Sequence, residues 1–174
     1  MSQDAPVERC EECGFTYDPA LARQAGRRIA LGAEQFAVII EDDTDLRRRP
    51  APDTWSVLEY GCHVRDVLLV QRERVLLARR VDQPSVVPMG RDERVEHDGY
   101  NEQYPSAVAR QLRDAAGLFA GALARCDDEA LRRTVIYNYP TPMVRDVAWI
   151  AVHTHHEVHH HLADVRRQID ERPN

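Results

Sequence analysis

The stretch HTHHEVHHHLADVRRQI, residues 153–169, is the strongest structural signal in the chain and holds six of its eight histidines. Apolar residues continue at helical spacing after the histidines, so the run belongs to a folded helix and is not a purification tag. Residues four apart lie on the same side of a helix and can bind one metal ion together. Glu157 with His161, His155 with His159, and His156 with His160 are candidate pairs with this spacing.

Three other segments show the apolar periodicity of helices. Residues 18–43 begin with Asp18 and Pro19, an N-cap followed by a proline suited to the first turn. Residues 55–81 contain a capping box from Ser56 to Glu59, and residues 105–125 form the third segment. The last helix is expected over residues 141–170. These four segments predict an all-α protein, a four-helix bundle.

Three connections separate these four helices. Residues 47–52 contain two prolines and predict a stiff loop. Residues 82–104 are rich in proline, glycine and charge, so we expect a long irregular connection of the kind that crosses the end of a bundle and is often functional. Residues 135–140 could form a short extended stretch. Four tyrosines near these segments could line a substrate entrance or simply pack at the end of the bundle: Tyr100, Tyr104, Tyr137 and Tyr139.

Composition limits the partners and the compartment. The 174 residues, 43% of them apolar, predict a single bundle domain over residues 18–174 after an N-terminal segment, residues 1–17. A net charge of −6 argues against nucleic acid and against an anionic membrane surface as partners. Neither a signal peptide nor an apolar run of about 20 residues is evident, which favours a cytoplasmic protein.

The N-terminal segment carries half of a zinc-binding motif. Cys10 and Cys13 stand in Cys-Glu-Glu-Cys-Gly, which is typical of a zinc-ribbon knuckle. A complete site would need further ligands from distant parts of the chain, because Cys62 and Cys126 are isolated from each other. The alternative interpretation is two reduced surface cysteines.

His63 is a candidate third ligand for the last helix, because it lies on the strongly helical segment 55–81. Periodicity alone does not choose between Glu157 with His161 and His155 with His159. At least two of the six clustered histidines are expected in solvent, and His155 could be a buried histidine with one hydrogen bond. Arg65 and Asp66 are expected to form a surface or interhelical ion pair.

Two stretches of the sequence resemble the DinB superfamily: WSVLEYGCHVRD, residues 55–66, and HEVHHHLADV, residues 156–165. This family comprises four-helix bundles with up-down-down-up order, among them mycothiol-dependent maleylpyruvate isomerases and bacillithiol transferases. The resemblance implies that His63, Glu157 and His161 bind a divalent metal, zinc or else nickel. His156 and His160, beside them, could orient the ligands or transfer protons.

The resemblance also implies a metal-dependent enzyme acting on a small-molecule substrate. The metal would activate a low-molecular-weight thiol such as mycothiol for S-transfer to, or isomerisation of, an electrophilic compound. A metal-dependent hydrolase would use the same three ligands. Other hypotheses are a non-catalytic, metal-stabilised binding or stress-response module, and a bundle without metal whose histidines lie on the surface. A homodimer is compatible with the resemblance.

Overall fold

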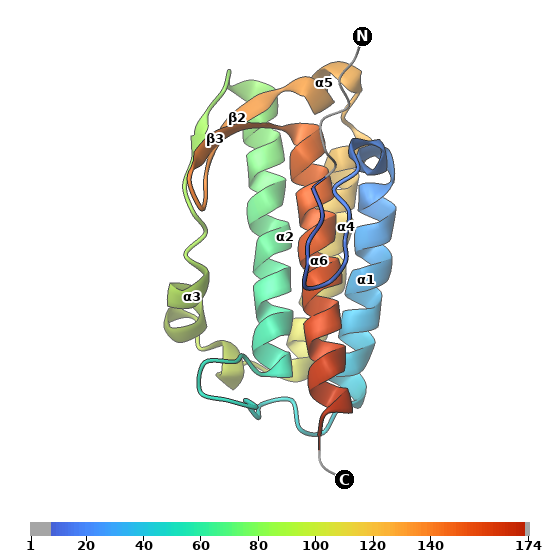
Figure 1. Ribbon diagram of the computed structural model, residues 1–174, viewed down its shortest axis with the longest axis vertical. Coiled ribbons are helices and arrows are strands. Elements are labelled where there is room, and N and C mark those ends of the chain that lie inside the picture. The colour runs from blue at the N-terminus through green and yellow to red at the C-terminus, as the bar shows by residue number, and fades with distance from the viewer. Residues whose placement is uncertain (1–7, 173–174) are drawn as a thin grey trace.

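The computed structural model describes residues 8–172, and four long helices dominate it (Figure 1). They are α1 (Ala22–Asp42), α2 (Val57–Arg80), α4 (Pro105–Ala124) and α6 (Val147–Asp170). α1 and α6 run in one direction, while α2 and α4 run in the other (Figure 1). The predicted four-helix bundle with up-down-down-up order is therefore confirmed.

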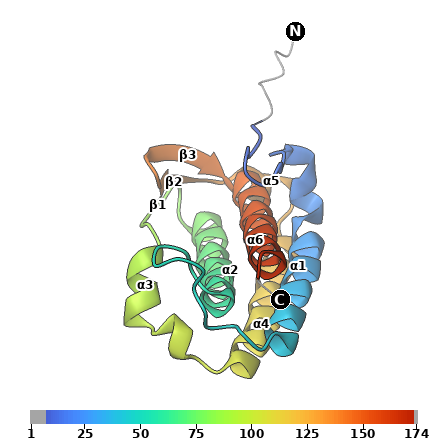
Figure 2. The same cartoon turned by 60° about the horizontal axis from the view of Figure 1, so that its bottom comes forward.

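Short elements join these helices. Some of them are single helical turns or short helices: η1 (Pro19–Leu21), α3 (Arg91–His97), η2 (Tyr100–Glu102) and α5 (Asp128–Arg132). Strands β1 (Ser85–Val86), β2 (Thr134–Asn138) and β3 (Pro142–Asp146) form one sheet in the order β1-β2-β3. β1 is parallel to β2, and β2 is antiparallel to β3. The sheet lies across one end of the bundle, beside the start of α6 (Figure 2).

Two predictions, one about a connection and one about the start of a helix, were wrong. The connection 82–104 is not irregular, because it contains β1, α3 and η2. α6 begins at Val147 rather than near residue 141, since Asp146 accepts a hydrogen bond from the amide of Trp149 and caps the helix there. Residues 142–146 instead pair with β2, and Val144 lies opposite Ile136. Residues that helical periodicity assigned to the last helix therefore form strand β3 instead.

The core lies where α1 and α2 each pack against both α4 and α6. Large side chains with almost no exposed surface fill it, including Ile29, Phe36, Leu58, Leu112, Phe119 and Ile150. α1 and α6 approach closely at Gly32, where an added Cβ would lie 2.6 Å from Cγ1 of Val158. This tight packing fixes α6, the helix that carries the histidines.

The N-terminal loop, residues 8–17, folds back along α6 (Figure 1). An isolated antiparallel bridge joins Arg9 to Thr16, and the buried ring of Phe15 packs edge-on against His155 with ring centroids 5.0 Å apart. The loop therefore covers part of the helix surface that bears the histidine run. Within the described residues, every helix is too short or too polar to cross a membrane.

Candidate metal centre

Three residues that are far apart in sequence converge between α2 and α6. Nε2 of His63 is 3.9 Å from Oε2 of Glu157, and Nε2 of His161 is 3.7 Å from the same oxygen. Their donor atoms all lie within 4.8 Å of one another. These separations exceed hydrogen-bond length but suit donors that share an ion at about 2.0–2.2 Å. The structure brings together the three residues that the resemblance implied.

The capping box of α2 and the aromatic rings around it position His63. Ser56 accepts a hydrogen bond from the amide of Glu59, and the Glu59 carboxylate accepts one from the amide of Ser56, which fixes where the helix begins. His63 lies two turns later, and Trp55 covers it with ring centroids 4.9 Å apart. The Nε2 atom of His63 thus faces Glu157 from a buried position.

A carboxylate orients the second imidazole. Nδ1 of His161 is 3.1 Å from Oδ2 of Asp164, one turn further along α6. Such a partner holds the proton on Nδ1 and leaves Nε2 free to bind an ion, as in the carboxylate–histidine pairs behind many zinc ligands. The donor set therefore fits a divalent metal.

The surroundings of this cluster favour positive charge. Burial alone would raise the pKa of Glu157, but contacts with His156, His161 and His63 outweigh it and hold the pKa well below its usual value. Burial lowers the pKa of His161, but Asp164 and Glu157 outweigh it and raise the pKa to about 9. A cation among these groups would be stabilised by two carboxylates.

A second group of donors lies on the neighbouring face of α6. Cys10, Cys13, His156 and His160 each offer one ligand atom, all within 4.8 Å of one another. Sγ of Cys10 is 3.7 Å from Nδ1 of His160. Burial raises the pKa of Cys10, but backbone hydrogen bonds from Cys13 and Glu12 and the contact with His156 lower it to about 6. The structure thus places the knuckle cysteines beside the histidine run.

The histidine run is mostly covered. Of its six members, all within the described chain, only His159 is exposed. The prediction that at least two would be in solvent was wrong, because the N-terminal loop and the sheet cover neighbouring faces of α6. His155 is buried as predicted, although its Nδ1 has no hydrogen-bond partner among the described residues. The hypothesis of a surface histidine patch therefore fails.

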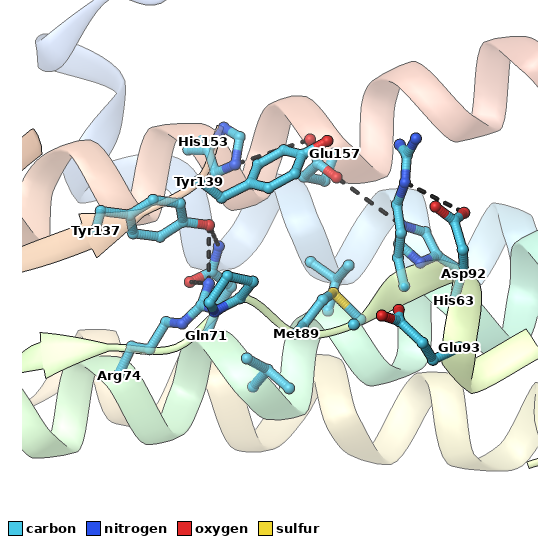
Figure 3. Close-up of a pocket in the computed structure, with 15 residues that line it drawn as sticks. His63, Gln71, Arg74, Met89, Asp92, Glu93, Tyr137, Tyr139, His153 and Glu157 are labelled. Atoms are coloured by element: carbon cyan, nitrogen blue, oxygen red, sulfur yellow. Dashed lines mark hydrogen bonds and ion pairs between the residues drawn. The ribbon is translucent and has the colours of Figure 1, made fainter. Parts of the chain in front are cut away.

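A pocket of about 330 Å³ opens beside His63 and Glu157, two members of the first cluster, which comprises His63, Glu157 and His161 (Figure 3). His63 and Glu157 lie at one end, and Arg74, Gln71 and Tyr137 lie at the other (Figure 3). Apolar residues form much of the wall between them: Val67, Val70, Pro88 and Met89. The connection after α2 thus supplies one wall of the pocket through residues 88–93.

The far end of the pocket is polar, and hydrogen bonds join its side chains. The hydroxyl of Tyr137 is 3.0 Å from Nε2 of Gln71 and 2.8 Å from Nη1 of Arg74. Tyr139 also lines the pocket. Tyr137 and Tyr139 thus line a pocket, whereas Tyr104 is 79% exposed and lies outside it; a substrate entrance there stays a prediction.

His153 is a pocket residue that the sequence analysis did not single out. Its ring stacks on Trp149 with centroids 4.5 Å apart, and its Nε2 is 3.9 Å from Oε1 of Glu157. Burial lowers the pKa of His153 to about 4, which makes it neutral near pH 7. The four-residue spacing of His153 and Glu157 was a usable signal, because residues so spaced share a helix face.

A buried ion network holds the loop wall against α2. Arg65 Nε is 2.8 Å from Oδ1 of Asp66, while Oδ2 of Asp66 accepts hydrogen bonds from Arg94 at 2.9 Å and from Tyr100 at 2.7 Å. The expected surface or interhelical pair of Arg65 and Asp66 is thus a buried contact between consecutive residues of α2. Tyr100 therefore stabilises the wall of the pocket through its hydrogen bond to Asp66 and does not line the pocket itself.

Comparisons with known proteins agree with this architecture. The sequence model of the DinB superfamily matches residues 33–165. Among solved structures, YfiT from Bacillus subtilis is similar with a TM-score of 0.71 and 17% identity, covering 98% of this chain and 95% of YfiT. YfiT is described as a probable metal-dependent hydrolase with an unusual four-helix bundle topology. No curated protein sequence matched the chain.

Proposed function

Because the chain belongs to the DinB superfamily, we propose that it is a metal-dependent enzyme whose ion is bound by His63, Glu157 and His161. Zinc suits two imidazoles and one carboxylate, and nickel is the alternative. The observation that carries the proposal is the position of this cluster: His63 and Glu157 form one end of a pocket with room for a small molecule.

Three protein ligands would leave an open position, where a bound divalent ion lowers the pKa of a nucleophile such as water or a thiol. The chain's own residues would then shape the reaction. His153 lines the pocket and is neutral near pH 7, because burial lowers its pKa to about 4, so it would hold the substrate by a hydrogen bond rather than act as a strong base. Arg74 and Tyr137 would bind the polar part of the substrate, and Val67, Val70 and Met89 its apolar part.

Hydrolysis of a small-molecule substrate is the reaction that we favour, because YfiT shares the fold and is described as a probable metal-dependent hydrolase. Transfer or isomerisation with a low-molecular-weight thiol such as mycothiol would use the same three ligands and the same open position. The two reactions differ in the nucleophile, so they can be separated by supplying or omitting the thiol.

The first test is the metal content of tag-free protein after saturation with zinc and removal of excess ion. Each of the variants His63→Ala, Glu157→Gln and His161→Ala should lose about one equivalent relative to the wild type while keeping its helical circular dichroism. His159→Ala is the matched control, because His159 lies on the same helix and is exposed. Full metal occupancy in any of the three variants would overturn the ligand assignment.

The second test is activity against a panel of activated esters, amides and electrophilic alkyl halides, with and without a low-molecular-weight thiol. Metal-dependent turnover without thiol would support hydrolysis, and turnover only with thiol would favour transfer. His153→Gln should retain metal but lower kcat/KM about 10-fold, as expected for the loss of one hydrogen bond to the substrate. A metal-loaded protein that binds none of these compounds and turns none over would favour the non-catalytic module.

A further inference from the structure

We propose that Cys10, Cys13, His156 and His160 form a second, structural zinc site that fastens the N-terminal loop to α6. This site does not depend on the proposed enzymatic function. Two of its ligands come from residues 8–17, and the other two lie one turn apart on α6. The set is Cys2His2, the composition of closed structural zinc sites.

The loop has the backbone shape of a zinc knuckle. The amide of Cys10 donates to the carbonyl of Phe15 at 2.8 Å, and the amide of Gly14 donates to the carbonyl of Cys10 at 2.9 Å. Gly14 has φ of +72°, a conformation that glycine adopts without strain. The turn brings the two sulfur atoms within 4.8 Å of each other and of the two histidine nitrogens.

The separations of the donors agree with tetrahedral zinc. With Zn–S of about 2.3 Å and Zn–N of about 2.0 Å, a sulfur and a nitrogen on one ion lie about 3.5 Å apart. Cys10 Sγ and His160 Nδ1 are 3.7 Å apart, and all four donors lie within 4.8 Å. Only a small contraction is needed to complete the site.

Each imidazole has one nitrogen held by a neighbour and one left for the ion. Nδ1 of His156 is 2.7 Å from the hydroxyl of Tyr17, while its Nε2 is buried without a hydrogen-bond partner in the described part of the chain. Nε2 of His160 is 3.3 Å from Glu12 and 3.6 Å from Asp164, which leaves Nδ1 facing Cys10. An unpartnered buried nitrogen is costly, and a metal bond would satisfy it.

The second site can be filled together with the first. His63, Glu157 and His161 share no residue with the Cys2His2 set. Two smaller donor groups, one at His153, His156 and Glu157 and one at His160, His161 and Asp164, each mix members of both sets. The division into a three-ligand and a four-ligand site lets two ions bind without sharing a residue, and it gives one open and one closed centre.

Such a site would explain how the short loop is held in place. Phe15 is the buried residue of the loop, and its ring contacts His155, His156 and His159. Phe15 and the half-buried Tyr17 are the aromatic side chains that anchor the loop, whereas each of its ten residues loses backbone freedom when the loop is ordered. A zinc ion bridging loop and helix would provide further stabilisation.

The test is a cobalt(II) titration of the tag-free full chain under reducing conditions, because cobalt bound to thiolates shows an intense charge-transfer band. The wild type should bind two equivalents, with the band following one of them. Cys10→Ser/Cys13→Ser should lose the band and one equivalent, whereas His63→Ala should lose the other equivalent and keep the band. Cys126→Ala is the control for a cysteine outside the site.

Trypsin provides an independent measurement, since Arg9 is exposed next to Cys10. Zinc should slow cleavage after Arg9 in the wild type and in His63→Ala, but not in Cys10→Ser/Cys13→Ser or His160→Gln. A wild type without the band, a band that survives loss of both cysteines, or zinc-independent cleavage would each overturn the proposal. Retained helical circular dichroism in the variants shows that the bundle is folded.

Discussion

His156 and Glu157 are consecutive in the chain, yet their side chains belong to different donor clusters. Successive residues of a helix point about 100° apart, so one faces the N-terminal loop and the other faces α2. Oε2 of Glu157 faces His63 and His161, while its Oε1 is 3.5 Å from Nδ1 of His156. The two clusters therefore share a contact as well as a helix.

Asp164 makes the second connection between the clusters, and its removal should weaken metal binding. It is 3.1 Å from Nδ1 of His161 and 3.6 Å from Nε2 of His160. Asp164→Asn removes the charge that orients both rings, so zinc affinity should fall about 10- to 100-fold. Competition with a chromophoric chelator measures the change, and Asp170→Asn, an exposed aspartate of the same helix, is the control. Equal affinity in the two variants would contradict the role given to Asp164.

The bundle could be predicted from sequence because its signals are local. Apolar periodicity and caps such as Ser56 lie within one segment, and α2 and α4 were placed to within two residues. The start of α6 was misplaced because Val144 fits a helical stripe equally well. Val144 pairs with Ile136 on the neighbouring strand, and helical periodicity carries no information about pairing between strands.

The metal ligands were predicted from family resemblance rather than from spacing. Several pairs on α6 have the same four-residue separation, and only the tertiary structure shows that His63 faces Glu157 and His161. The partners of Cys10 and Cys13 could not be predicted, because the loop reaches α6 across about 150 residues of chain. Long-range contacts of this kind leave no periodic signal in a single sequence.

The pocket wall should loosen when the Asp66 network is broken. Asp66 is buried and accepts hydrogen bonds from Arg65, Arg94 and Tyr100. Asp66→Asn should lower the free energy of unfolding by about 3 kcal/mol, because it leaves the buried charge of Arg65 without its partner. Hydrogen exchange should also speed up in α3 and η2, and Glu96→Gln is the exposed control on α3. Unchanged exchange there would show that other contacts hold the wall.

Glu59 should make stability depend on pH in the acidic range. Burial raises its pKa, but hydrogen bonds with Arg49 and Ser56 outweigh burial and lower it. Because the folded pKa is lowered, the stabilisation is present above the unfolded pKa of about 4.3 and is lost as the pH falls through the folded value. Glu59→Gln should be less stable by about 1–2 kcal/mol at pH 7.

Urea denaturation between pH 7 and pH 3 would measure this effect. The difference between wild type and Glu59→Gln should shrink as the pH falls below about 4.3. Glu73→Gln is the control, because the Glu73 side chain is 69% exposed beside Arg72 and surface pairs contribute little. A difference that stays constant over this range would mean that the charge of Glu59 is not the stabilising feature.

Two glycines should respond in opposite ways to substitution by alanine. At Gly32 an added Cβ would lie 2.6 Å from Cγ1 of Val158, so Gly32→Ala forces α1 away from α6 or moves the Val158 side chain. Overpacking of this kind should cost about 1–3 kcal/mol. Gly117 lies on the exposed face of α4 with nothing within 4 Å of the added atom, and Gly117→Ala should stabilise by about 0.5–1 kcal/mol.

Urea denaturation of zinc-saturated protein would test this pair. Since Val158 follows Glu157, Gly32→Ala should also weaken zinc binding at the first cluster, whereas Gly117→Ala should leave zinc affinity unchanged. If Gly32→Ala is as stable as the wild type and binds zinc equally well, Val158 can move without disturbing Glu157, and close packing of α1 on α6 is not what positions the metal ligands.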